Sequence, residues 1–244
     1  MTIYEALNAA IAAEQPVAVA TIIGGAGTIG AKLLARPDGS TLGELDSDLP
    51  VAAILADMLA MLARAESGTR RYPAPAGEAE LFIESYPPPP TMFIVGAVHI
   101  AIPLVTFAKV LGFRTVVVDA RGAFATPERF AHADELVNEW PDEALAGRLN
   151  SNSFVVLLTH DPKLDDPALK VALPSPARYV GALGSPSTHA KRLARLRGEG
   201  LPEDQLARLH APIGLKIGGN TPEEIAVSII AEIVAARHGL TGRA

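Results

Sequence analysis

Residues 91–121 have the sequence TMFIVGAVHIAIPLVTFAKVLGFRTVVVDAR. The apolar run at 92–95 predicts a buried strand, and after a glycine turn the apolar residues recur at helical spacing up to Gly112, which is placed to end the helix. The β-branched run at 114–118 predicts a second strand that ends on Asp119. A strand, a glycine turn, a helix, a strand and a terminal acid are typical of the first half of a dinucleotide-binding βαβ unit.

The glycine turn departs from the nucleotide-binding fingerprint at one position. The fingerprint requires G-x-G-x-x-G or G-x-G-x-x-A, whereas residues 96–101 are GAVHIA, so Val98 stands at the second glycine. That glycine normally lets the backbone approach a pyrophosphate, and a β-branched side chain in its place crowds a dinucleotide. Asp119 follows Gly96 at close to the spacing of about 20 residues that the motif expects. The stretch therefore favours the fold more strongly than it favours a bound dinucleotide.

Composition limits the classes of function. The chain has 244 residues, of which 49% are hydrophobic and 20% charged, the balance of a globular protein with a substantial core. Its net charge of −6 argues against a nucleic-acid partner, because such domains are usually basic. The chain has no cysteine, which excludes disulfides, thiolate metal sites and thiol nucleophiles on this chain and fits a reducing cytoplasm.

Targeting signals are not expected. The N-terminal sequence MTIYEALNAAIAAEQ has acidic residues and no basic segment, so we predict no signal peptide. We also predict no membrane span, because no apolar run reaches about 18 residues without a charged residue or a proline. Together these features predict a cytoplasmic protein.

Four consecutive prolines at 87–90 are typical of a stiff, extended linker. We therefore predict a smaller N-terminal α/β domain over 1–86 and a Rossmann-like domain over 91–244. The helix expected at 51–63 is strongly apolar. Burial of this helix in a homodimer interface and burial within the chain are equally plausible. The other elements expected before the linker are a helix at 2–14 and strands at 17–23, 31–35, 40–43 and 81–85.

Strands and helices alternate after the linker. The helix expected at 223–237 follows Thr221-Pro222-Glu223-Glu224, a capping box, and its wide apolar face suits packing on a sheet. Such alternation predicts a mostly parallel sheet with helices on both faces. The other elements expected beyond Asp119 are strands at 135–138, 154–158 and 179–183 and helices at 141–149, 167–173 and around 191–197.

Ligands of such sheets bind beyond the carboxyl ends of the strands. Four turns are expected to meet there, at 96–99, 119–121, 159–161 and 184–185. The first and the last open helices, whose free backbone N–H groups favour a phosphate or another anion. No catalytic residue and no metal ligand is predicted. The predicted cofactor-binding residues are Gly96, Ala97, Val98, His99, Asp119, Arg121, His160, Gly184 and Ser185.

The side chains at these turns also have structural interpretations. His99 either contacts a ligand, as a phosphate partner or an acid–base group, or caps its own turn. Asp119 and Arg121 either hold a ribose hydroxyl and a phosphate or pair with each other at the end of their strand. His160 and Asp161, with Asp165 and Asp166 following, form a segment that is more typical of helix caps and solvated turns than of a metal site.

Two further features lie outside these turns. The basic residues at 191–197 are more typical of the solvent-facing side of a helix than of an anion-binding surface. His210 lies in an expected loop, where a ligand contact and a structural hydrogen bond are about equally typical.

Several segments resemble a known family. GAVHIAIPL at 96–104 and HAPIGLKIGGNTPEEIAVSIIAEI at 210–233 carry the resemblance, together with 116–130, 157–169 and 179–185 and, more weakly, 30–45. The chain resembles the XdhC/CoxI family, accessory proteins for the maturation of xanthine dehydrogenase and carbon monoxide dehydrogenase. The resemblance implies a Rossmann-like C-terminal domain that binds the molybdenum cofactor, a molybdopterin-type group, and delivers it to a molybdoenzyme of one of these types.

The chain departs from the family pattern at expected ligand contacts. Val98 replaces a glycine, GELDSDL at 43–49 stands where the family has a cysteine-containing segment, and Pro186 replaces a basic residue after Ser185. Lys216 stands where the family has an acid. The resemblance therefore predicts a non-catalytic cofactor-binding factor with altered or weakened ligand preference. The alternatives are an NAD(P)-dependent oxidoreductase and an interaction module that has kept the fold without a ligand.

Overall fold

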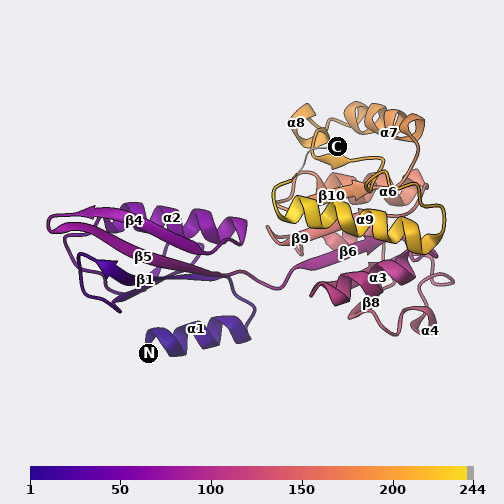
Figure 1. The fold of residues 1–244 in the computed structure, drawn as a ribbon. Coiled ribbons are helices and arrows are strands. Elements are labelled where there is room, and N and C mark those ends of the chain that lie inside the picture. The colour runs from indigo at the N-terminus through magenta and orange to yellow at the C-terminus, as the bar shows by residue number, and fades with distance from the viewer. Residues whose placement is uncertain (241–244) are drawn as a thin grey trace. The chain divides into compact units, whose positions relative to one another are not determined.

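The computed structural model describes residues 1–240 (Figure 1). The chain divides into two compact units, Met1–Pro88 and a second that begins at Pro89. The first unit is an antiparallel sheet with two helices, and the second is a parallel sheet with helices on both faces. The predicted α/β class, with a Rossmann-like parallel sheet after a smaller α/β unit, is therefore confirmed.

The first unit has five strands in the order β3-β2-β1-β5-β4. Its helix α2 buries Ile54, Met58 and Met61 against the sheet of the same unit. Because this apolar face is used within the unit, α2 gives no argument for a homodimer. The elements are α1 (Ile3–Ala12), β1 (Val17–Gly25), β2 (Lys32–Ala35), β3 (Thr41–Gly43), α2 (Val51–Arg64), β4 (Gly68–Ala74) and β5 (Gly77–Tyr86).

Strand β4 was not predicted. It forms an antiparallel hairpin with β5, whose C-terminal half is the strand expected at 81–85. Of the residues in β4, only Tyr72 is buried, because β4 lies at the edge of the sheet and carries polar side chains. A strand with so little apolar alternation gives no periodic signal in the sequence.

The second unit has six parallel strands in the order β11-β10-β9-β6-β7-β8. The chain starts at the centre with β6, winds outward to β8, and returns to β9 on the other side of β6. This is a doubly wound order. The chain adds strands first on one side of β6 and then on the other, so the direction of winding reverses between β6 and β9. The strands are β6 (Thr91–Val95), β7 (Arg114–Val118), β8 (Glu135–Val137), β9 (Ser153–Leu157), β10 (Tyr179–Ala182) and β11 (Leu209–His210).

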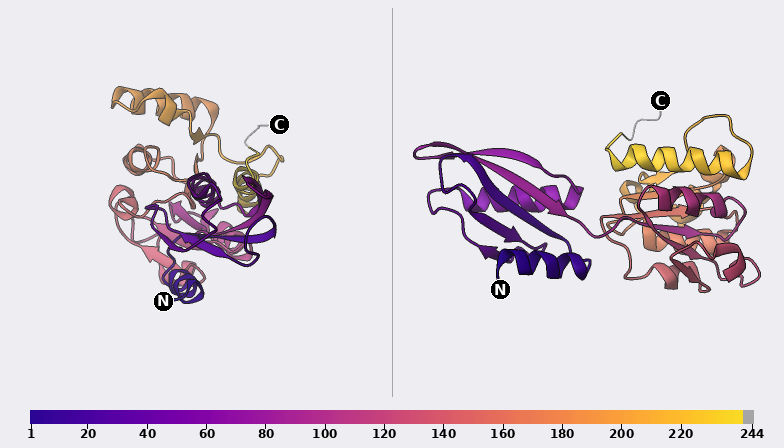
Figure 2. Two further views of the ribbon diagram at one scale, coloured as in Figure 1. Left: turned by 90° about the vertical axis from the view of Figure 1, so that its left-hand side faces the viewer. Right: turned by 60° about the horizontal axis from the view of Figure 1, so that its bottom comes forward.

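Helices cover both faces of this sheet, each over its own apolar cluster (Figure 2). On one face α3 and α9 pack side by side, and the opposite face is covered by α5, α6, α7 and α8. The helices are α3 (Ala101–Val110), α4 (Pro127–Phe130), α5 (Pro141–Leu145), α6 (Pro162–Ala172), α7 (Pro186–Gly198), α8 (Glu203–Leu206) and α9 (Pro222–Arg237).

The starts of three helices test the capping predictions. Ser185 caps α7 with Pro186 at the first helical position, and Thr221 opens α9 with the full capping box, as predicted. Helix α6 begins five residues before the predicted 167, because the carboxylate of Asp161 accepts the N–H of Lys163 and Pro162 takes the first position. Pro167 therefore lies inside α6 rather than at its start.

A buried carboxylate fixes the loop after β11 to the sheet. Glu232 of α9 accepts one hydrogen bond from the hydroxyl of Tyr179 and another, at 2.7 Å, from the N–H of Gly214. Its other oxygen lies 3.5 Å from Nδ1 of His210, whose ring packs against Tyr179. Burial would raise the pKa of Glu232, but the hydrogen bonds from His210 and Tyr179 outweigh it, and the pKa is lowered.

We predict that Glu232→Gln lowers the free energy of unfolding at pH 7 by about 1–3 kcal/mol, because it removes the charge on which Tyr179, Gly214 and His210 converge. Glu223→Gln, on the exposed side of the same helix, serves as the control. A group whose pKa is lowered on folding stabilises the protein above its unfolded pKa, so the difference between wild type and Glu232→Gln should shrink below about pH 4. Urea unfolding at several pH values measures this, and equal losses for the two variants contradict it.

Candidate functional site

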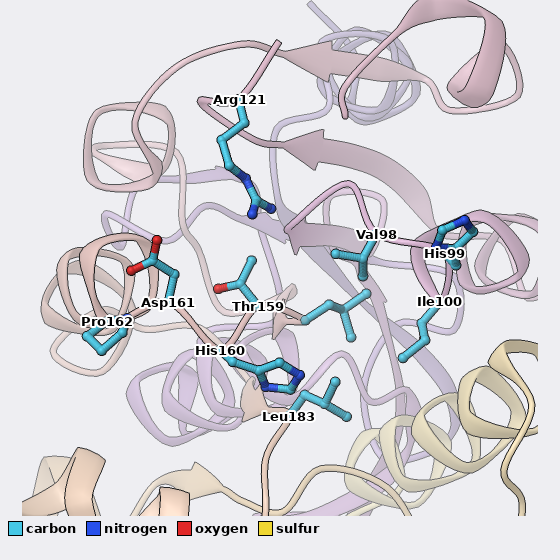
Figure 3. Close-up of a pocket in the computed structure, with 10 residues that line it drawn as sticks. Val98, His99, Ile100, Arg121, Thr159, His160, Asp161, Pro162 and Leu183 are labelled. Carbon is cyan, nitrogen blue, oxygen red and sulfur yellow. The ribbon is translucent and has the colours of Figure 1, made fainter. Parts of the chain in front are cut away.

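A pocket of about 650 Å³ opens at the carboxyl ends of the parallel strands, where the winding reverses between β6 and β9 (Figure 3). Sites at this point of an open α/β sheet are common, because the turns after neighbouring strands diverge to opposite faces. The residues that line the pocket follow β6, β7, β9 and β10 and are Val98, His99, Ile100, Arg121, Leu158, Thr159, His160, Asp161, Pro162 and Leu183.

The four predicted turns meet at this pocket, but only some of the predicted residues line it. Val98, His99, Arg121 and His160 line it, whereas the other five predicted residues do not. The fourth turn contributes Leu183 in place of the predicted glycine and serine. Sequence reasoning missed Ile100, Leu158, Thr159, Asp161, Pro162 and Leu183. Of these, Leu158 and Leu183 directly follow strands β9 and β10. Their position at the carboxyl end of a strand is the sequence signal that could have identified them.

Gly96 lies in the crowded turn after β6, two residues before the pocket residue Val98. Its φ of +106° is a conformation that side-chain-bearing residues rarely adopt, and an added Cβ would lie 2.5 Å from Cγ2 of Thr159. Glycine thus lets the turn after β6 approach the turn after β9. This close approach joins two of the walls of the pocket.

The predicted free N–H groups of this turn are only partly free. The N–H of Gly96 donates to the carbonyl of Val118, and the N–H of Ala97 donates to the carboxylate of Asp119 at 2.8 Å. The prediction of an anion site was wrong for these two groups. The N–H groups of Val98, His99 and Ile100 donate to no residue within 1–240 and lie at the N-terminal end of α3.

Asp119 is buried and its carboxylate accepts four hydrogen bonds. One comes from Ala97, and the others come from Arg121, through its backbone N–H, Nε and Nη2, at 2.8–3.0 Å. Burial would raise the pKa of Asp119, but the hydrogen bonds from Arg121 and Ala97 outweigh it, and the pKa is lowered. A carboxylate has about four acceptor positions, so the side chain predicted to hold a ribose is fully occupied.

Arg121 is fixed on both sides. Asp119 binds one edge of its guanidinium, whose pKa this pairing raises, and the ring of Phe124 lies 4.4 Å from its central carbon. Nη1 donates to no partner in the described part of the chain, and the residue lines the pocket. The guanidinium is therefore a pre-positioned cation with one free donor edge. Figure 3 shows the Arg121 side chain among the residues that line the pocket.

A second buried pair supports the opposite wall. Thr159 donates to Asp165, and Nη2 of Arg192 donates both to Asp165, at 2.9 Å, and to the carbonyl of Leu183, at 3.0 Å. Burial raises the pKa of Asp165, and the contacts with Thr159 and Arg192 offset this only in part. Because Thr159 and Leu183 both line the pocket, this network fixes the turns after β9 and β10 together.

Two expectations about charged side chains need correction here. Asp165 and Asp166 are buried residues of α6, not members of a solvated turn, and they pair with Arg192 and Arg195. Arg192 is only 1% exposed, so the basic stretch of α7 is not wholly a solvent-facing surface. Within residues 1–240 no group of three or more His, Asp or Glu side chains is arranged to hold a metal ion.

The strand order, with a pocket at the point where the winding reverses, is that of a Rossmann-type domain. A family model described as the XdhC Rossmann domain matches residues 92–233, and one described as the XdhC and CoxI family matches residues 10–73. The chain belongs to the XdhC and CoxI family.

Three curated proteins are similar to parts of this chain. "Uncharacterized protein YqeB" of Escherichia coli is 29% identical over 93% of this chain and 44% of its own length. A protein of Bacillus subtilis, named as a probable subunit of xanthine dehydrogenase, is 34% identical over 64% of this chain and 46% of its own length. "Molybdenum cofactor insertion chaperone PaoD" of E. coli is 30% identical over 38% of this chain and 29% of its own length. The aligned part is less than half of each relative.

A solved structure shares the fold. A crystal structure of a protein from Bacillus halodurans, described as a xanthine dehydrogenase, superposes with a TM-score of 0.56 and 24% identity, covering 98% of this chain and 96% of the other. Within the described residues, none of the helices has the length and apolar character to cross a membrane.

We predict that Gly96→Ala lowers the free energy of unfolding by about 1–3 kcal/mol, because alanine is strained at this φ and its Cβ would overlap Thr159. Gly122→Ala is the matched control, since no atom lies within 4 Å of the added Cβ and its φ is ordinary. Denaturant unfolding measures both variants. A loss for Gly96→Ala no larger than that for Gly122→Ala would show that the turn relaxes without cost.

Proposed function

We propose that this protein is an accessory factor that binds a phosphate-bearing cofactor of the molybdopterin type and delivers it to a molybdoenzyme of the xanthine dehydrogenase or carbon monoxide dehydrogenase type. The observation that carries the proposal is the pocket at the switch point of an XdhC Rossmann domain, with the fixed guanidinium of Arg121 at its edge. The name of the relative PaoD, a molybdenum cofactor insertion chaperone, supports the choice of cargo.

The pocket fits such a cargo in size and chemistry. Its volume of about 650 Å³ lies in the range of small-molecule sites. The free edge of Arg121 and the N–H groups at the start of α3 suit a phosphate, while the partly exposed side chains of Ile100 and Leu183 suit the apolar face of a flat ring. The chain has no cysteine, so it adds no thiolate to the metal, and the molybdenum chemistry would be supplied by the cofactor in its client enzyme.

Binding is favoured over turnover. The side chains of His99 and His160 are exposed and form no hydrogen bond within the described residues, so neither has the orienting partner that a general base usually has. The alternative of an NAD(P)-dependent oxidoreductase is disfavoured by Asp119, whose carboxylate has no acceptor position left for a ribose hydroxyl.

We predict that the molybdenum cofactor, added anaerobically at 100 times its dissociation constant, stabilises the protein by about 2.7 kcal/mol, seen as a higher thermal midpoint, while NAD and NADP give no shift. Arg121→Gln should weaken cofactor binding at least about tenfold by calorimetry, because a charged hydrogen bond to the phosphate is lost. Lys163→Gln removes an exposed cation next to the pocket and should bind as the wild type does.

The midpoints of both variants without ligand separate a loss of binding from a loss of stability, since Arg121 also satisfies buried Asp119. A shift with NAD or NADP alone would overturn the proposal in favour of an oxidoreductase. No shift with any of the three ligands would leave an interaction module as the better description.

A further inference from the structure

We infer that the outer edge of β11, with the groove beside it, binds an extended peptide segment of a partner protein, which adds a strand to the parallel sheet. The groove is a cavity of about 570 Å³ between β11 and the helices α7 and α8. It shares no lining residue with the pocket at the switch point. The inference therefore does not depend on the cofactor proposed above.

The groove runs along the main chain of β11. Leu209, His210 and Ala211 follow one another in the chain, and all three line it. Successive side chains of a strand point to opposite faces of the sheet. Accordingly, Leu209 and Ala211 belong to the apolar cluster under α7 and α8, whereas the ring of His210 packs against Tyr179 on the α9 face. A cavity that touches all three residues borders the edge of the strand, not one of its faces.

This edge offers backbone hydrogen-bonding groups. In the described part of the chain, β11 is the last strand of its sheet and pairs with β10 alone, through Leu209 and His210. The N–H and C=O groups of an outer strand that are not directed to its neighbour point away from the sheet. An extended peptide satisfies such groups in the same way as another strand does.

Two of the other outer strands are protected against such an addition. The exposed side of β4 carries Arg71 and Pro73, and β8 carries Glu135, which pairs with two arginines. Charged side chains and proline are the usual means by which an outer strand avoids pairing with a further chain. In contrast, the polar side chain of β11 is that of His210, which is directed at Glu232 and away from the edge. The edge of β11 lacks this protection.

The shape of the groove suits one extended chain. The partly exposed side chain of Leu193, from α7, and the exposed Ala207, which follows α8, form its outer wall. A single strand lies about 4.8 Å from its neighbour and fits inside this wall, whereas the edge of a second copy of the sheet would bring its own helices against α7 and α8. Because β11 has two residues, a bound segment makes few main-chain hydrogen bonds. An apolar side chain packed against Leu193 would supply the remaining affinity.

The test uses blocked six-residue peptides in which leucine, valine or phenylalanine alternates with threonine. They are titrated into the 244-residue protein and followed by ¹H–¹⁵N NMR. We expect saturable shifts of the N–H signals of residues 206–211 with at least one peptide. Each peptide that binds is then made in two further versions, N-methylated at the odd or at the even positions, which removes the donors of one edge or of the other. Because one edge of the peptide faces β11, one version should bind at least about tenfold more weakly and the other within about threefold of the parent.

Two variants with matched substitutions locate the site. Ala207→Trp fills the groove from an exposed position and should weaken peptide binding at least about tenfold. Ala190→Trp changes an exposed residue of α7 that does not line the groove, and it should bind as the wild type does. Both side chains are exposed, so the thermal midpoints of the two variants should match that of the wild type.

Three results would overturn the inference. The first is the lack of a saturable shift at residues 206–211 with every peptide up to about 1 mM. The second is equal affinity of the two N-methylated versions, which would identify an apolar ligand site without strand pairing. The third is a shift of the same signals with protein concentration in the absence of peptide, which would identify a second copy as the occupant. None of these measurements involves the cofactor, so the inference and the proposed function fail independently.

Discussion

The site depends on the carboxylate of Asp119, which ties the turn after β6 to the turn after β7. A buried charge is costly unless its hydrogen bonds are made, and this one is satisfied by one N–H of the first turn and three N–H groups of Arg121. The same bonds set the guanidinium at the edge of the pocket and remove Ala97 from the set of donors available to a ligand. One interaction thus determines both which cation the pocket offers and which backbone groups it withholds.

The other half of the pocket is organised in the same way. Asp165 joins Thr159 to Arg192, and Arg192 in turn binds the carbonyl of Leu183, so the turns after β9 and β10 are held by a buried ion pair. Replacing either partner alone would leave the other buried and unpaired. Most polar groups around the pocket therefore bind one another, and few donors remain available to a ligand.

Strands and helix caps could be predicted from the sequence where the signal for them lies within a few consecutive residues. Strands β6, β7, β9 and β10 are buried on both faces and appear as continuous apolar runs, and the caps of α7 and α9 are contained within four consecutive residues. Edge strand β4 lacks such a run and was missed. The start of α6 was placed at Pro167, although Asp161 and Pro162 carry the same capping signal five residues earlier.

Long-range pairs could not be predicted in this way. Nothing near Arg192 in the chain shows that it is buried, because its partner Asp165 lies in another helix. Likewise, the position of Asp119 fits ribose binding, and only the fold reveals that Ala97 and Arg121 occupy it first. The place of the pocket could be predicted from the order of the strands, whereas which of its polar groups are free depends on contacts between turns that are far apart in the sequence.

The contrast between two kinds of histidine bears on what such a pocket does. His210 has a buried carboxylate beside it and an aromatic ring against it, the arrangement that orients an imidazole, but it does not line the pocket. His99 and His160 do line the pocket and have no such partners among the described residues. A proton-transfer site needs an oriented base at the ligand, whereas a carrier needs groups that hold a charge and then release it. Among the residues that line the pocket, the side chain whose position is fixed by charged and aromatic neighbours is Arg121.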